Sequence, residues 1–219
     1  MKFTALAMSV LLVLGSCGMN NTAKGGLIGG GAGAALGALV GKIAGNTAVG
    51  AAVGTAVGAG AGVLIGRKMD KAKAEAEKIA AAQVESVQDA NGLQAVKVTF
   101  DSGILFDLNS STLKNAARNS LSQFSNVLKS NADMDVAIFG HTDKTGTLEV
   151  NQRISLQRAQ AVQTYLKSLG VDGSQLVTVE GRDYQEYDES KSAAENRRVE
   201  VYLYASKEMI EAANNGTLQ

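Results

Sequence analysis

Two charged side chains of opposite sign stand where they could hold a ligand. Asp143 ends the run GHTD at 140–143, directly after an apolar stretch, and Arg158 follows fifteen residues later in a stretch with helical periodicity. A carboxylate on a loop accepts hydrogen bonds from an ammonium group, and the planar guanidinium of an arginine holds a carboxylate with two parallel bonds. Two such side chains can therefore hold the two ends of a ligand that carries both charges. The alternative is that Asp143 caps a turn and Arg158 forms a salt bridge with it.

Catalytic interpretations of the same region are weaker. His141 is the only histidine, and because no nucleophile elbow or fixed partner is evident, we interpret it as a structural residue. A hydrolase would need two catalytic carboxylates or a metal, whereas here one acid is matched to an arginine. With one histidine and one cysteine, the chain cannot assemble the common His/Cys metal sites by itself. We therefore expect no enzyme activity, no metal and no cofactor.

The elements that must position these residues have the pattern of a packed α/β domain. Alternating or continuous apolar residues predict strands at 96–100, 134–140, 176–180 and 199–204. Apolar residues at helical spacing predict one helix that is capped by Ser110 or Ser111 and runs to Leu128, and another over 150–169 that Gly170 ends. Strands separated by helices imply a sheet with helices packed against it. The expected fold class is α/β (α+β), with two layers and a mixed sheet.

Three motifs occur in order: GHTD, the run NQRISLQRA at 151–159, and NRRVE at 196–200. Together they resemble the OmpA-like peptidoglycan-binding domain, which is shared by OmpA C-termini, Pal lipoproteins and MotB, and the resemblance covers about residues 98–204. It implies that the ligand is diaminopimelate of the peptidoglycan stem peptide, whose side chain ends in an ammonium and a carboxylate. It also implies that Asp143 takes the ammonium and that Arg158 takes the carboxylate.

The resemblance implies further site residues around this pair. Thr142 belongs to the GHTD motif, and Asn151 matches the loop residue that meets the ligand. The run FDLN at 106–109 matches the segment that lines one side of the pocket, which adds Phe106, Asp107 and Asn109. Arg197 and Arg198 lie in the terminal motif that flanks the pocket. Because strand neighbours alternate, one of these two arginines should point inward, and the sequence leaves open which one binds.

The N-terminal residues predict secretion and lipidation. Lys2 precedes an apolar run over residues 3–14 that is too short to span a bilayer, and LGSC follows at 14–17. This resembles the lipobox of bacterial lipoproteins, which implies that Cys17 is acylated after removal of a signal peptide over 1–16. The alternative is an ordinary secretory peptide with an incidental cysteine. Since Cys17 is the only cysteine, it has no partner for an internal disulfide, and lipidation gives it a purpose.

Glycines then recur at every fourth position in two series, 25–45 and 50–66. Such spacing gives each helix a face without side chains, which allows close helix packing in lipid. The segments 27–45 and 48–66 have 19 residues each, enough for a thin bilayer. We predict a membrane hairpin over 25–66, after a lipidated tether over 17–24. The segment resembles the glycine-zipper hairpins of envelope lipoproteins, and the alternative is a flexible Gly/Ala linker.

The remaining segments complete the expected organisation. Residues 67–91 are rich in Ala, Lys and Glu and predict a solvated helical spacer, which Asn91 and Gly92 would end. The peptidoglycan-binding domain would occupy 92–205, and a loose polar tail would occupy 206–219. The lipobox, hairpin and domain together resemble YiaD-type lipoproteins.

These features predict a non-catalytic tether between the outer membrane and peptidoglycan, with its C-terminal domain in the periplasm. Gly18 follows Cys17 where an aspartate would be the usual signal for retention in the inner membrane of enteric bacteria, so we expect the outer membrane. The formal net charge is zero, which gives no electrostatic footprint for nucleic acid. A Pal-like component that docks to envelope proteins, a homo-oligomer and a peptidoglycan-acting enzyme stay as alternatives. A MotB-like stator is disfavoured because its transmembrane helix would need a proton-carrying aspartate, and residues 25–66 contain no acidic residue.

Overall fold

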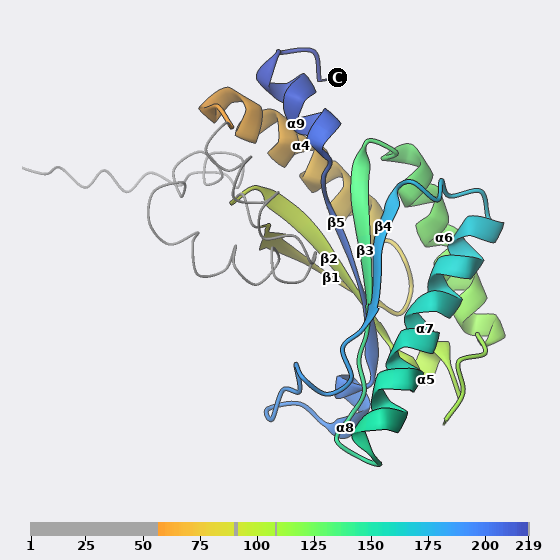
Figure 1. Cartoon of the computed structure of the whole chain (residues 1–219). Helices are drawn as coiled ribbons and strands as arrows, with labels where there is room; N and C mark the ends of the chain where they lie inside the picture. Colours follow the sequence, from red (N-terminus) through yellow and green to blue (C-terminus); the bar gives the residue numbers. More distant parts are fainter. Residues whose placement is uncertain (1–56, 90–91, 108, 219) are drawn as a thin grey trace, which may run out of the picture.

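A computed structural model describes residues 57–89, 92–107 and 109–218 (Figure 1). The predictions for the signal peptide, for Cys17 and for most of the glycine hairpin therefore lie outside the described residues. In the described part of the chain, none of the helices combines the length and the apolar composition needed to cross a bilayer.

The described strands form one mixed sheet in the order β1-β2-β5-β3-β4. Neighbouring strands run antiparallel, except that β3 and β4 are parallel. This confirms the expected α/β fold with a mixed sheet. The strands are β1 (Ala82–Gln88), β2 (Gln94–Asp101), β3 (Met134–Gly140), β4 (Leu176–Gly181) and β5 (Arg198–Ala205).

Helices α6 (Asn115–Ser130) and α7 (Leu148–Ser168) pack on one face of this sheet (Figure 1). Alternation along β2 turns Val96, Val98 and Phe100 toward these helices, and all three are buried. The ring of Phe100 meets that of Phe124 from α6 edge to face, with centroids 5.6 Å apart. Each such side chain stabilises the fold by about 1.5–3 kcal/mol through burial. The main core therefore lies between the sheet and its helices.

Helix α6 begins later than the sequence predicts. Its first residue is Asn115, and the N-cap residue Lys114 makes no side-chain capping hydrogen bond. Leu113 instead forms an isolated β-bridge with Phe106, so the chain stays extended past Ser110 and Ser111. The predicted serine cap is therefore wrong.

The predicted solvated spacer over 67–91 is also wrong. Helix α4 (Ala59–Ala76) packs on β1, β2 and α6. Its inward face is formed by Ile65, Met69, Ala72 and Ala76, none of which is exposed. These positions follow helical spacing, but two of them are alanines, so the strong helix propensity of the segment concealed its apolar stripe.

The second half of the same segment is a strand. β1 pairs with β2 over its whole length, and Gly92 lies at φ 71° in the short connection between them. Asn91, which lies outside the described residues, and Gly92 were predicted to end a helix, but the same pair of residue types is also typical of a tight turn between strands. The folded unit therefore begins well before residue 92.

Two other predicted segments, the membrane hairpin and the polar tail, also differ in the structure. Ala61 and Ile65, within the predicted membrane hairpin, lie in the main core, so the hairpin prediction is wrong for 59–66. The predicted loose tail contains helix α9 (Lys207–Asn214), which Ser206 caps and which packs on α4. Met209 and Ile210 of α9 are buried, which explains why the tail is ordered.

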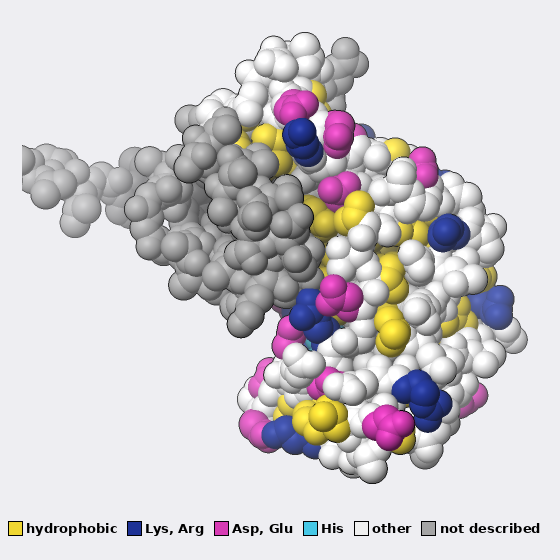
Figure 2. Space-filling model, viewed as in Figure 1, with side chains coloured by type: hydrophobic (Ala, Val, Ile, Leu, Met, Phe, Trp, Pro, Cys, Tyr) yellow, Lys and Arg dark blue, Asp and Glu magenta, His cyan; other side chains and the backbone are white. Residues whose placement is uncertain are grey.

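The surface agrees with the balanced charge of the sequence. On the face shown in Figure 2, Lys and Arg side chains of the described residues lie among Asp and Glu side chains. This distribution gives no broad field of one sign for a polyanion such as nucleic acid.

Candidate functional site

A pocket of about 200 Å³ lies where α5 (Ser102–Leu105), α7 and the start of β5 meet. It brings together three segments that are far apart in the chain. Its lining consists of Ser102, Gly103, Phe106, Asp107, Lys114, Arg158 and Arg197. Three of these side chains are cationic and one is acidic, so the pocket is suited to an anionic group.

Two glycines allow α7 to lie close to the sheet beside this pocket. A Cβ placed on Gly140, at the end of β3, would lie 2.1 Å from the carbonyl oxygen of Ser155. A Cβ on Gly181, at the end of β4, would lie 2.4 Å from the Ser155 hydroxyl. Both distances are too short for any side chain. The glycines therefore fix the height of α7 over the sheet, and with it the position of Arg158 nearly one turn further on.

Arg158 lies in the wall of the pocket and is only 5% exposed. Its Nε donates to the carbonyl of Ser110 at 3.1 Å, and its guanidinium carbon lies 5.3 Å from the centre of the Phe106 ring. Burial lowers the pKa of Arg158, and the nearby Arg197 lowers it further, while Asp143 opposes both. The group stays cationic at neutral pH because arginine loses its proton only far above that range.

Asp143 is held in the loop that connects β3 to α7. Its Oδ1 accepts from the backbone N–H of Thr145 at 2.9 Å and from the Thr145 hydroxyl, and its Oδ2 accepts from Arg197. Burial raises the pKa of this carboxyl, but the bonds from Thr145 and Arg197 outweigh it, so the pKa lies below its ordinary value. Asn151 donates to the carbonyl of Thr145 at 2.9 Å and so closes the same loop.

The two arginines of the terminal motif have different surroundings. Arg197 lines the pocket and forms an ion pair with Asp143. Arg198 is buried, and its Nε donates to Glu200 at 2.7 Å while its Nη1 donates to the carbonyl of Asn196 at 3.2 Å. The structure therefore places Arg197 with Arg158 and Asp143, and Arg198 with a separate polar cluster.

Of the other predicted site residues, some line the pocket and some do not. Phe106 and Asp107 line the pocket, and Asp107 forms an ion pair with Lys114 at 3.0 Å. Thr142 is buried and donates through its backbone N–H to the carbonyl of Asp183. Asn109 is exposed, at φ 53°, and is not among the residues of the pocket wall.

Sequence reasoning missed Lys114 and Ser102 as pocket residues. Ser102 follows β2 directly, and Lys114 donates to the carbonyl of Gly103 at 3.0 Å. Lys114 directly precedes helix α6, but the sequence predicted that this helix begins earlier, with Lys114 inside it. Ser102 gives no signal in the sequence, since its position depends on β2 lying next to β5.

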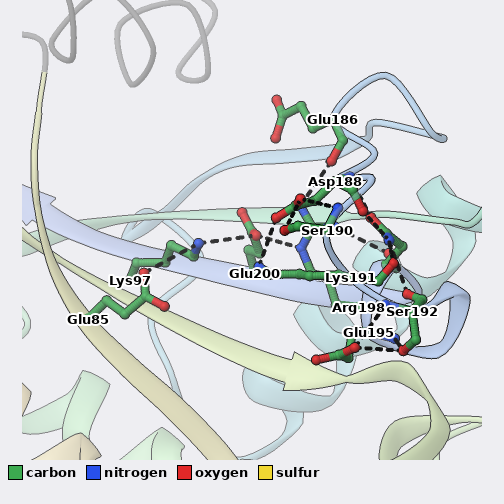
Figure 3. Close-up of polar contacts among 11 residues, drawn as sticks. Glu85, Lys97, Glu186, Asp188, Ser190, Lys191, Ser192, Glu195, Arg198 and Glu200 are labelled. Atoms are coloured by element: carbon green, nitrogen blue, oxygen red, sulfur yellow. Dashed lines mark hydrogen bonds and ion pairs between the residues drawn. The ribbon is translucent and has the colours of Figure 1, made fainter.

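His141 belongs to the polar cluster around Glu200. His141 Nε2 lies 3.6 Å from Glu200 Oε2, which is longer than a hydrogen bond. Figure 3 shows that Lys97 and Arg198 reach Glu200 from β2 and β5. Burial raises the pKa of Glu200, but His141, Arg198 and Lys97 outweigh it and hold the pKa well below its ordinary value. Tyr202 donates its hydroxyl to the same carboxylate at 2.7 Å.

One group among the described residues has the composition of a metal site. Ligand atoms of His141, Glu186 and Glu200 lie within 4.8 Å of one another. Glu200 is already paired with Arg198 at 2.7 Å and with Lys97 at 3.4 Å. A metal ion there would meet two cationic side chains at close range, so these residues do not fit a metal.

Comparisons with known proteins agree with the fold. A sequence model of the OmpA family matches residues 105–200, and a model of the YMGG-like Gly-zipper matches residues 1–70. The probable lipoprotein YiaD of Escherichia coli is 40% identical over 46% of this chain and 47% of its own length. The peptidoglycan-associated lipoprotein of Pseudomonas aeruginosa is 35% identical over 53% of this chain and 67% of its own length. The matched region thus spans about half the length of the first of these relatives.

Two solved structures are similar as well. The cell wall anchor of the T6SS from Pseudomonas aeruginosa is 25% identical, with a TM-score of 0.51 over 63% of this chain and 97% of that chain. A putative MotB-like protein from Desulfovibrio vulgaris is 19% identical, with a TM-score of 0.54 over 64% of this chain and 93% of that chain. The second likeness supports the fold alone.

Proposed function

The chain belongs to the OmpA family, and from this premise we propose that it is a non-catalytic lipoprotein that tethers the outer membrane to peptidoglycan. In this proposal Cys17 carries the lipid, and the domain binds diaminopimelate of stem peptides in the periplasm. The relatives named as outer-membrane proteins and lipoproteins support the envelope location.

The observation that carries the proposal is the environment of Arg158. Arg158 is 5% exposed, and its described contacts in the pocket wall are a carbonyl and an aromatic ring rather than a carboxylate. The nearest carboxylate, Asp143, acts on Arg158 electrostatically but forms its ion pair with Arg197, so a carboxylate from outside would best complete the pocket. The carboxylate of diaminopimelate fills this role, with its ammonium directed to Asp143.

The same geometry supports a binding function over catalysis. A pKa below the ordinary value keeps Asp143 ionised at neutral pH, so it has no proton to give as a general acid. Arginine retains its proton, so Arg158 and Arg197 do not act as bases. Side chains with fixed charges are suited to binding charged groups.

The proposal is tested by sedimenting the mature protein, in detergent, with purified peptidoglycan sacculi. Arg158→Ala and Asp143→Ala should each weaken binding by about ten- to a hundredfold, because each removes a charge-assisted interaction. Matched controls are Arg153→Ala, at an exposed position of α7, and Asp172→Ala, in an exposed turn. Wild-type binding in folded Arg158→Ala and Asp143→Ala variants would refute the proposed site.

A further inference from the structure

We propose that, when no ligand is bound, the guanidinium of Arg197 occupies the position beside the Asp143 carboxylate that a ligand ammonium would take. This arrangement makes the pocket selective for a zwitterionic end group. The inference rests on the proposed function, since it concerns how the diaminopimelate end enters. In this role, which we call the selector role, Arg197 determines which end groups bind and does more than line the pocket.

Both carboxylate oxygens of Asp143 already accept hydrogen bonds. Oδ1 accepts two bonds from Thr145, and Oδ2 accepts from the guanidinium of Arg197. The Asp143 side chain is 6% exposed, whereas that of Arg197 is 33% exposed. Arg197 lines the pocket, and Asp143 is not among the residues of its wall. A ligand ammonium therefore reaches Asp143 only after the guanidinium of Arg197 moves aside.

The attachment of Arg197 is compatible with such a movement. Its backbone is fixed, because its N–H donates to Ala193 at 3.1 Å and its carbonyl accepts from Ser102 at 2.8 Å. Its guanidinium, in contrast, is held within the described residues by the pair with Asp143. The neighbouring Arg198 is held by Glu200 and two backbone carbonyls and is buried. Only the side chain of Arg197 is thus free to exchange its partner while the backbone stays in place.

A count of charges shows what the exchange requires. Asp143 contributes one negative charge, and Arg158 and Arg197 contribute two positive charges, which leaves one positive charge. Lys114 and Asp107 cancel each other. A zwitterionic end adds no net charge, and its carboxylate gives the displaced Arg197 a new partner beside Arg158. A lone ammonium would raise the local charge to two positive, with no anion for either guanidinium.

Repulsion between like charges in a partly buried site is strong enough to select between these ligands. We therefore infer that Arg197 discriminates against stem peptides that end in lysine, which carry an ammonium without the adjoining carboxylate. Without Arg197, Asp143 would be open to any ammonium.

The experiment measures the affinity of the full chain, in detergent, for two synthetic stem peptides by calorimetry. The peptides are identical except that one contains meso-diaminopimelate and the other lysine. Wild type should prefer the first, and Arg197→Gln should lower this preference about tenfold, as expected for loss of one charge-assisted contact. Binding of the lysine peptide should increase in absolute terms, an effect that a purely structural role for Arg197 would not produce.

Arg197→Lys keeps the charge and should keep most of the preference, and Arg153→Gln is the matched control on the exposed face of α7. Circular dichroism verifies folding, and the Lys variant provides a second comparison if the Gln variant is unstable. An unchanged preference in folded Arg197→Gln would overturn the selector role while the proposed function stands. Binding of neither peptide by wild type would overturn both proposals.

Discussion

Substitution of Gly140 by alanine tests whether the contact between α7 and the sheet determines both stability and binding. The added Cβ would lie 2.1 Å from the Ser155 carbonyl oxygen and 2.9 Å from its carbon, whereas ordinary contact begins at 3.4 Å. The difference, 3.4 minus 2.1, means that α7 must retreat from β3 by about 1.3 Å at this point. The obstacle is backbone, so no rotamer change can relieve it.

The expected loss of stability lies at or above the upper end of the range for overpacking, about 3 kcal/mol. Binding should suffer separately, because Arg158 lies three residues beyond Ser155 and moves with the helix. Productive binding geometries tolerate about 0.5 Å, so the displaced guanidinium should lose most of its contribution to affinity. Urea unfolding of a fragment from residue 57 onward gives the stability, and calorimetry with the diaminopimelate peptide gives the affinity.

Gly62→Ala is the matched control, because a Cβ there would meet nothing within 4 Å. In helix α4 this change should stabilise the fragment by about 0.5–1 kcal/mol, the ordinary advantage of alanine over glycine. If Gly140→Ala unfolds within about 0.5 kcal/mol of wild type and binds the peptide normally, the tight contact does not set the position of Arg158.

Three further predictions concern other parts of the chain. Met69→Ala should destabilise the protein by about 2–4 kcal/mol, since Met69 is fully buried, whereas Lys71→Ala should have little effect. Equal urea unfolding midpoints of the two variants would mean that α4 is only a spacer. Burial, and then Glu208, raise the pKa of Asp135 from 3.8 to about 6, so its contribution to stability is lost as the pH rises through this window. Asp135→Asn should therefore gain about 1 kcal/mol at neutral pH, after allowance for solvent screening, and nothing below about pH 4 in urea unfolding; the same gain at both pH values would contradict this. Cys17→Ser should abolish incorporation of a fatty-acid analogue in cells, and labelling of the serine variant would disprove lipidation at that position.

The sequence predicted the central part of the fold because the periodicity there is strong. The alternation of Val96, Val98 and Phe100 identified β2, and the apolar run of 134–140 identified β3. Helix α7 was predicted to within two residues at its start and one at its end. These elements bury large side chains at regular spacing, so local pattern and tertiary packing agree.

The errors arose where the buried face is small or polar. The inward side of α4 includes Ala72 and Ala76, which do not stand out in a segment rich in alanine. In β1 the apolar positions are few, and its identity as a strand depends on pairing with β2 along its whole length. Tertiary pairing of this kind overrides local helix propensity, and a single sequence does not display it.

For the candidate site, the sequence identified the charged residues but not their pairing. It predicted that Asp143 and Arg158 hold the two ends of a ligand, which stays a prediction, and the alternative was a salt bridge between them, whereas the ion pair of Asp143 in the structure is with Arg197. Arg197 has extended backbone directly before β5, so its side chain and that of Arg198 diverge, but which one faces the pocket depends on the register of β5 with β2 and β3. Register is set by contacts across the whole sheet, and so it lay beyond sequence reasoning.

The arrangement of charges links binding to stability in this domain. Arg158 stays buried beside a second cation, Arg197, and the one nearby carboxylate, Asp143, forms its ion pair with Arg197, so burial of Arg158 is unfavourable for folding unless a further anion is present. If a ligand carboxylate supplies that anion, it binds the folded state and not the unfolded chain, so occupancy must raise the stability of the domain. The cost of holding Arg158 in place without a ligand is offset by the main core between the sheet and its helices. Under the proposed function, the domain would be most stable when it is attached to the wall, which is the state in which a tether carries load.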